Sequence, residues 1–188
     1  MKTATPRIAP IPVDEADGKA RELLDELASR GGEPGAMARA MATAPALLRG
    51  YLDLNRAMKR THLDRRVVER INLAVHEWLG CDYCLVAHTR AARQLMVPDS
   101  EIQLARQATS SDPAIAAIVA FAQQVLAAPA EIGDADIQRL RAHGYRDEQI
   151  AEVAGLVGLQ LLTGGFNLIA GIHATAGALA ELTPPTSG

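Results

Sequence analysis

The chain has 188 residues, which is enough for one domain with a sizeable hydrophobic core. Its formal net charge is −3 and its pI is about 5.9, so the composition gives no electrostatic support for binding to nucleic acid or to an anionic membrane. Only 3% of the residues are aromatic, Ala and Leu are abundant, and strand-like alternation is scarce. We therefore expect a single all-α domain over residues 1–188.

The N-terminal segment differs in composition from the rest of the chain. Residues 1–13 contain Pro6, Pro10 and Pro12 and show no helical period, which predicts an extended arm. In an oligomer, we expect this arm to lie along a neighbouring subunit. The segment also lacks the apolar core of a secretory signal peptide, which favours a cytoplasmic location.

Apolar periodicity and capping residues predict a series of helices. In the first half these run from Asp14 or Asp17 to about Ser29, over 36–41, from about Ala46 to Met58, and from a capping box at 61–64 onward. In the second half they run to about Met96, from Asp99 to about Gln107, from Pro113 to about Ala128, and from Asp134 to His143. Residues 134–153 have the outline of a helix-turn-helix, but few basic residues follow, which argues against DNA binding.

The C-terminal part is long and apolar. No residue from 153 to 180 carries a formal charge, which raises the question of a membrane span. Polar side chains such as Gln160 and the glycine pair at 164–165 weaken that interpretation. We predict instead two buried helices that meet at the glycine pair, with small residues that let helices or subunits approach closely, and hence a homo-oligomer.

Both cysteines lie in residues 69–88, ERINLAVHEWLGCDYCLVAH, as a C-x-x-C motif. Gly80 predicts the end of one helix, so Cys81 and Cys84 fall in the first turn of the next, where free N–H groups stabilise a thiolate. Residues three apart on a helical turn are also close enough to form a disulfide. The motif therefore predicts a redox-active cysteine pair.

Two further residues have the chemistry to assist the thiols. His88 follows Cys84 by four residues, so the two side chains share a helix face. Glu69 is the candidate carboxylate that pairs with this histidine and exchanges protons at neutral pH. The spacing to His88 favours Cys84 as the nucleophile, whereas the helix start alone favours Cys81.

The same residues also have other interpretations. Cys81, Cys84 and His88, with His76 as a fourth ligand, would form a tetrahedral zinc site. A second alternative is that the cysteines are unreactive apolar residues of the core, because free Cys is among the most buried residue types, but the joint spacing of the motif argues against it. His76 is expected on the helix surface or in the core, and Trp78 is expected to pack.

The spacing of Glu69, Cys81, Cys84 and His88, with its G-C-x-Y-C-x-x-x-H segment, resembles the alkylhydroperoxidase D-like and carboxymuconolactone decarboxylase-like superfamily. The resemblance implies an all-helical trimer or hexamer. It implies that Cys84 attacks a hydroperoxide, that Cys81 resolves the sulfenic acid as a disulfide, and that Glu69 and His88 relay protons. An external dithiol or thiol protein would restore the thiols, and no metal, flavin or haem is required.

One position departs from the family pattern. Tyr83 stands where better-studied peroxidases of the family have a second histidine, which implies a shorter proton relay and slower peroxide turnover. The resemblance also puts Tyr51 or Met58 near the substrate, and we expect Phe166 and Asn167 to support the site, or Asn167 to cap a helix.

Two other functions stay open. One is a lactone decarboxylase-like reaction, in which the thiols have no necessary part. The other is a non-enzymatic metal-binding or structural oligomer.

Overall fold

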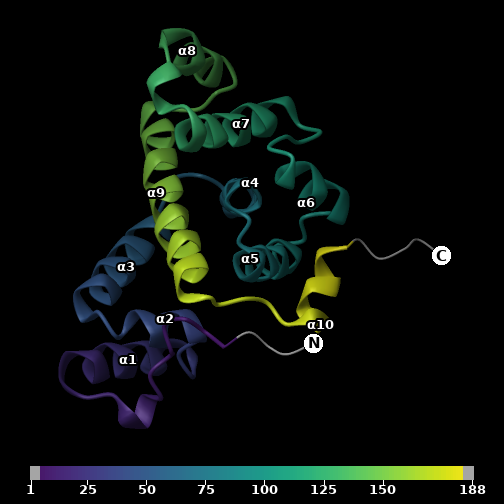
Figure 1. The fold of residues 1–188 in the computed structure, drawn as a ribbon. Helices are drawn as coiled ribbons and strands as arrows, with labels where there is room; N and C mark the ends of the chain where they lie inside the picture. Colours follow the sequence, from purple (N-terminus) through teal and green to yellow (C-terminus); the bar gives the residue numbers. More distant parts are fainter. Residues whose placement is uncertain (1–4, 184–188) are drawn as a thin grey trace.

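The computed structural model describes residues 5–183, and this part of the chain is all-α, as the composition predicted (Figure 1). The α-helices are α1 (Gly18–Gly31), α2 (Ala36–Met41), α3 (Pro45–Met58), α4 (Arg65–Leu79), α5 (Asp82–Gln94), α6 (Asp99–Arg106), α7 (Pro113–Ala127), α8 (Asp134–Ala142), α9 (Asp147–Ala170) and α10 (Ala176–Leu179). Short 3-10 turns lie at Val13–Glu15, Pro129–Glu131 and Ala180–Leu182. No strand occurs among residues 5–183.

Helix α4 is the centre of the fold. It packs against α5, α6, α7 and α9, which surround it in Figure 1. Its residues from Ile71 to His76 are all buried, because these four helices pack around it. Glu69 and His76 therefore project from a helix whose position is fixed by the core.

The turn between α4 and α5 has the conformation that its sequence predicted. Gly80 ends α4 with φ of 70°, a left-handed conformation that favours glycine. The backbone N–H of Cys81 then donates to the carbonyl of His76 at 3.1 Å. The turn therefore returns the first cysteine directly to the last turn of α4.

Three predicted helix starts are shifted, one of them at α8, where Gly133 is the N-cap and Asp134 is the first helical residue. The capping box at 61–64 is wrong, because Asp64 itself caps α4 by accepting from the N–H of Arg66 at 2.7 Å. Asp99 is the first residue of α6 rather than its cap. At α7 the prediction is accurate, and the Asp112 carboxylate accepts from the N–H groups of Ala114 and Ile115.

The prediction of two helices meeting at the glycine pair is also wrong. Helix α9 runs without interruption from Asp147 to Ala170 and contains Gly164 and Gly165 in its interior. Gly164 allows α9 to approach α4, since a Cβ there would lie 2.8 Å from Cδ1 of Leu79 and 3.0 Å from Nδ1 of His76. Close packing offsets the low helix propensity of glycine.

The described part of the N-terminal segment is non-helical up to Pro12, and its backbone is hydrogen-bonded to other parts of the same chain. The N–H groups of Arg7 and Ile8 donate to the carbonyl of Ala170, and that of Ile11 donates to Arg39. The arm therefore lies against its own α9 and α2. Residues 1–4 fall outside the described range.

Helix α9 is long and apolar enough to cross a membrane by length and composition. In the fold, 56% of its most apolar window is buried, mainly against α3, α4 and α7. This packing is that of the core helix of a soluble helical domain.

Candidate active site

The two cysteines stand at the start of α5 and form a disulfide. Cys81 is the N-cap residue, Cys84 is the third residue of the helix, and their Cα atoms are 5.4 Å apart. Both are almost completely buried, with exposed fractions of 1% and 4%. The helix start places free backbone N–H groups around Cys84, and these favour a thiolate when the pair is reduced.

Glu69 and His88 form a hydrogen-bonded pair beside the cysteines. Nδ1 of His88 lies 2.7 Å from Oε2 of Glu69, and the Asn72 amide donates to the same oxygen at 3.4 Å. A carboxylate oxygen only accepts, so Nδ1 carries the hydrogen and Nε2 of the neutral imidazole is the nitrogen that can take up a proton. The side chains of Glu69 and His88 are 14% and 23% exposed.

A cavity of about 230 Å³ opens onto Cys84 and His88. Cys81 is not among the residues that line it, so the second cysteine is the one that a small molecule meets. The walls combine aromatic, thioether and amide groups, namely Met37, Tyr51, Asn55, His76, Tyr83, Ala87, Leu159, Gln160, Thr163 and Asn167. Burial raises the pKa of Tyr51, whose hydroxyl therefore stays protonated at neutral pH.

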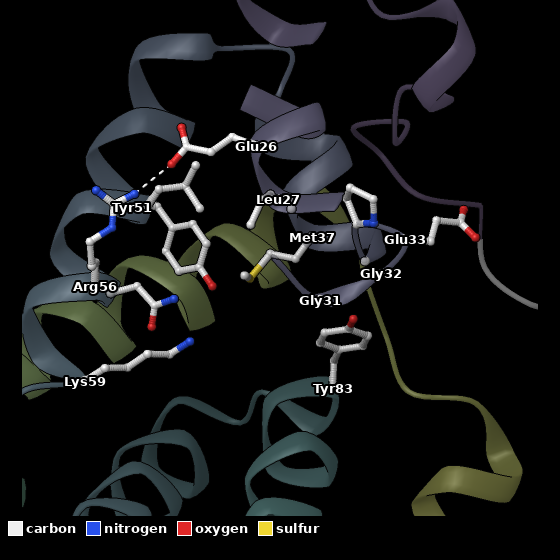
Figure 2. A pocket seen from close by; sticks show the side chains of 15 residues that line it. Glu26, Leu27, Gly31, Gly32, Glu33, Met37, Tyr51, Arg56, Lys59 and Tyr83 are labelled. Carbon is white, nitrogen blue, oxygen red and sulfur yellow. Dashed lines mark hydrogen bonds and ion pairs between the residues drawn. The ribbon is translucent and has the colours of Figure 1, made fainter. Parts of the chain in front are cut away.

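A wider cavity of about 430 Å³ continues outward from this one between α1, α2 and α3. The two cavities share Met37, Tyr51, Asn55 and Tyr83. Figure 2 shows Tyr51 and Met37 on one side of the opening, Tyr83 on the other and Lys59 reaching toward it. On its outer wall the Arg56 guanidinium donates to Glu26 at 2.7 Å. Tyr83 thus lies at the boundary between the outer and inner cavities.

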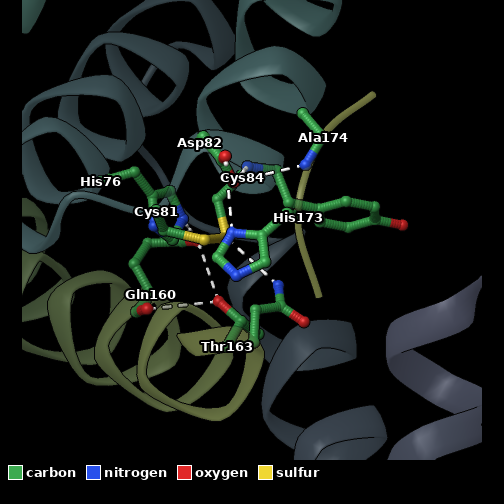
Figure 3. The surroundings of a disulfide bond; sticks show 10 residues. His76, Cys81, Asp82, Cys84, Gln160, Thr163, His173 and Ala174 are labelled. Atoms are coloured by element: carbon green, nitrogen blue, oxygen red, sulfur yellow. Dashed lines mark hydrogen bonds and ion pairs between the residues drawn. A yellow bond between two sulfur atoms is a disulfide. The ribbon is translucent and has the colours of Figure 1, made fainter. Parts of the chain in front are cut away.

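The other side of the disulfide faces α4 and α9 (Figure 3). His76 is fully buried, and its Nε2 lies 2.8 Å from Oε1 of Gln160. Burial, with a smaller contribution from the neighbouring His88, lowers the pKa of His76 to about 3, so its ring is neutral. The rings of His76 and His88 stack with centroids 5.0 Å apart.

Asn167 contacts the cysteine pair from α9. Its side-chain amide lies 3.2 Å from Sγ of Cys84 and donates toward it. The residue lies inside the helix and caps nothing, so the alternative prediction of a helix cap is wrong and its place beside the site is as expected. A donor at this position stabilises negative charge on the sulfur.

The structure groups the predicted metal ligands differently from the zinc hypothesis. A ligand atom of His76 and the sulfurs of Cys81 and Cys84 all lie within 4.8 Å of one another, whereas His88 is outside this group. In the disulfide the sulfurs are not thiolates and offer little to a metal. The two cysteines can act as metal ligands only when the pair is reduced. Together with His76 they then form a group of three ligands, whereas the zinc hypothesis required four.

The other expectations have mixed outcomes. Tyr51 lines the cavity, whereas Met58 lines a neighbouring one with Glu69 and His88. Phe166 packs against the apolar clusters around α1 and α2. Trp78 was expected to pack and instead is 51% exposed.

The fold and the site define a class: an all-α protein with a disulfide-forming C-x-x-C pair whose second cysteine lines a cavity. Residues 45–126 match the model of the Carboxymuconolactone decarboxylase family. A search of the curated proteins gives no match.

Solved structures share the fold over nearly the whole chain. An uncharacterized peroxidase-related protein from Silicibacter sp. is 21% identical, with a TM-score of 0.78 over 97% of this chain and 100% of that one. An alkylhydroperoxidase AhpD core protein, also peroxidase-related, from Ralstonia eutropha is 22% identical, with a TM-score of 0.76 over 94% and 98%. The debrominase Bmp8 in complex with 2,3,4-tribromopyrrole is 18% identical, with a TM-score of 0.76 over 94% and 95%.

Residues 45–126 are thus similar to the Carboxymuconolactone decarboxylase family, and the fold is shared with alkylhydroperoxidase-like, peroxidase-related proteins; both findings agree with the resemblance that the cysteine motif predicted.

Proposed function

We propose that this protein is a thiol-dependent hydroperoxide reductase, a peroxidase with antioxidant activity that works as a disulfide oxidoreductase. One observation carries the proposal: Cys84 lines a cavity together with His88, which is hydrogen-bonded to Glu69, while Cys81 stands behind it at disulfide distance. A nucleophile, a proton relay and a resolving thiol are thus adjacent.

The reaction begins with the Cys84 thiolate. Its sulfur attacks the terminal oxygen of a hydroperoxide, the O–O bond breaks, and the leaving alkoxide takes a proton from the His88–Glu69 pair to give an alcohol. For hydrogen peroxide the product is water. Cys84 is left as a sulfenic acid.

The cycle closes through Cys81. Its sulfur condenses with the sulfenic acid, which releases water and forms the disulfide. An external dithiol or a thiol protein then reduces the disulfide by thiol–disulfide exchange. The cycle requires no resident metal, flavin or haem.

Steady-state hydroperoxide consumption with a dithiol reductant tests the proposal. We expect turnover by the metal-free wild type, no turnover by Cys84→Ser, and a sulfenic acid in Cys81→Ser that a dimedone-type reagent traps. Wild-type peroxide loss no faster than with the reductant alone would exclude the peroxidase function.

The debrominase among the similar folds supports a second substrate class for the same thiols. The aromatic and thioether walls provided by Tyr51, Tyr83 and Met37 suit a planar ring. A halogenated pyrrole assayed beside the hydroperoxides, with halide release as the readout, distinguishes the two classes. A lactone decarboxylase-like reaction is the third candidate, and its activity would survive Cys84→Ser.

We propose further that the protein is a cytoplasmic homo-oligomer, a trimer or hexamer by its resemblance to the family. Trp78, Leu161 and Ile169 are large apolar side chains with exposed fractions of 51%, 48% and 66%. Exposed apolar surface of this kind is a feature of subunit interfaces. Light scattering after gel filtration measures the subunit number, and a monomer at micromolar concentration would contradict the proposal.

A further inference from the structure

His76 is buried beside the disulfide with one ring nitrogen unpaired. Its Nε2 is 2.8 Å from the side-chain oxygen of Gln160, which accepts, so Nε2 carries the hydrogen. Nδ1 is then a bare acceptor, and this atom is buried and has no hydrogen-bond partner. Buried acceptors without a donor are rare, so this one calls for a physical explanation.

Reduction of the cysteine pair supplies the missing donor. A disulfide carries no hydrogen, whereas the reduced pair brings two S–H groups to the same place. A ring nitrogen of His76 and both sulfurs lie within 4.8 Å of one another, and Figure 3 shows the three residues together. The imidazole with the unpaired nitrogen thus lies within a few ångströms of a thiol that exists only in the reduced protein.

The two cysteines differ in their access to other proton acceptors. Cys84 lines the cavity with His88, so the Glu69–His88 pair is available to it. Cys81 is 1% exposed, is not among the residues that line that cavity, and is held against the last turn of α4 by the hydrogen bond from its N–H to the His76 carbonyl. Cys81 therefore needs an acceptor inside the protein.

We propose that Nδ1 of His76 accepts the thiol proton of Cys81. Helix α4 then supplies the second histidine of the site, because this chain has Tyr83 where the better-studied peroxidases have a histidine. This role rests on the proposed disulfide cycle. In the condensing step the Cys81 sulfur bonds to the Cys84 sulfur, the S–O bond breaks, and the departing hydroxide takes up the proton that Cys81 lost. Atoms and charges balance with water as the product, and until this step the protonated His76 and the Cys81 thiolate form an ion pair in the reduced protein.

The surroundings keep His76 ready for this role. The titratable groups around it are His88, with Glu69 beyond it, the two cysteines, and Tyr51 and Tyr83 across the cavity. Helix α9 contributes only uncharged groups such as Gln160, Thr163 and Gly164. The lowered pKa of His76 keeps the ring neutral in the oxidised protein, so it enters each cycle with a free lone pair.

Thiolate absorbance against pH, measured in proteins with one cysteine, tests the assignment without any peroxide. With Cys84→Ser, which leaves Cys81, we expect adding His76→Gln to reduce the thiolate fraction at neutral pH by about tenfold. With Cys81→Ser, which leaves Cys84, the same change should have little effect, whereas His88→Gln should have a large one.

Equal shifts of both thiols, or none for Cys81, would overturn the assignment. Exposed His143 provides the matched control as His143→Gln. If His76→Gln fails to fold, ring ¹⁵N chemical shifts in the wild type decide: Nδ1 of His76 should change to a hydrogen-bonded or protonated shift on reduction, and an unchanged Nδ1 shift would contradict the proposal. If the wild type fails to turn over peroxide, the proposed peroxidase function is excluded. The role of His76 is still tested, because the thiolate absorbance and the ¹⁵N shifts are measured without peroxide.

Discussion

His88 and Glu69 are joined by a hydrogen bond of 2.7 Å between Nδ1 and Oε2, although they are 19 residues apart and lie on different helices. The bond fixes the imidazole tautomer, so that Nε2 is the nitrogen free to exchange a proton. His62 and Glu152 form a pair of the same length on the surface. The chain therefore contains both a candidate catalytic pair and a matched control.

Glu69→Gln should lower peroxide turnover by about 10²–10⁴-fold, because general acid–base assistance has that magnitude and a neutral amide does not hold the same tautomer. Glu152→Gln removes the carboxylate of the surface pair and should leave turnover unchanged. Steady-state kinetics of both variants check this prediction. Equal losses in the two would mean that Glu69 acts only through stability.

Asn167→Leu should reduce the fraction of Cys84 that is ionised at neutral pH, because the variant lacks the amide that donates toward Sγ at 3.2 Å. Asn167→Asp should reduce this fraction further, since a carboxylate repels the thiolate. Alkylation of Cys84 in the Cys81→Ser background, followed against pH, measures both effects. If both variants show the same pH dependence of Cys84 alkylation as the protein that retains Asn167, this contact has no role in ionisation of the thiol.

Gly164→Ala should destabilise the protein by about 1–3 kcal/mol, because the new methyl group would overlap Leu79 and His76 in a packed interface. Gly165→Ala is the control, since a Cβ there meets nothing within 4 Å. That change should stabilise α9 by up to about 1 kcal/mol. Urea unfolding measures both, and similar values would contradict the close approach of α4 and α9.

His76 should make the oxidised protein less stable as the pH falls below about 6.5, the ordinary pKa of histidine. Its pKa in the folded state is lowered to about 3, so between these values the unfolded state binds a proton that the folded state does not. Stability contributed by neutral His76 is therefore lost toward acid, at up to about 1.4 kcal/mol per pH unit.

The difference in unfolding free energy between wild type and His76→Gln isolates this effect from other titrating groups. It should shrink steadily from pH 7 to pH 5, and a difference independent of pH would show that His76 is not buried as a neutral ring. Oxidised protein is required, because a nearby thiolate favours the protonated ring.

The sequence predicted the fold class and most helices, because helix periodicity and capping residues are local signals. Pro113 after Asp112 and the Gly80 turn were recognisable without any tertiary contact. The glycine pair at 164–165 predicted a helix break, because glycine is a poor helix former. In the folded chain the helix continues, and Gly164 is a position where α9 packs closely against α4. Burial was also misjudged for Trp78, because a single chain does not reveal which face of a helix stays uncovered.

For the candidate site, local spacing by itself determined that Cys81 and Cys84 can pair and that His88 shares a face with Cys84. Only the tertiary structure placed Glu69 within hydrogen-bonding distance of His88, Asn167 against Cys84, and the His76 ring near both sulfurs. The physical reason is range. A helix fixes neighbours three or four residues apart, whereas contacts between residues more than 80 positions apart, such as His76 with Gln160, exist only after α9 packs against α4.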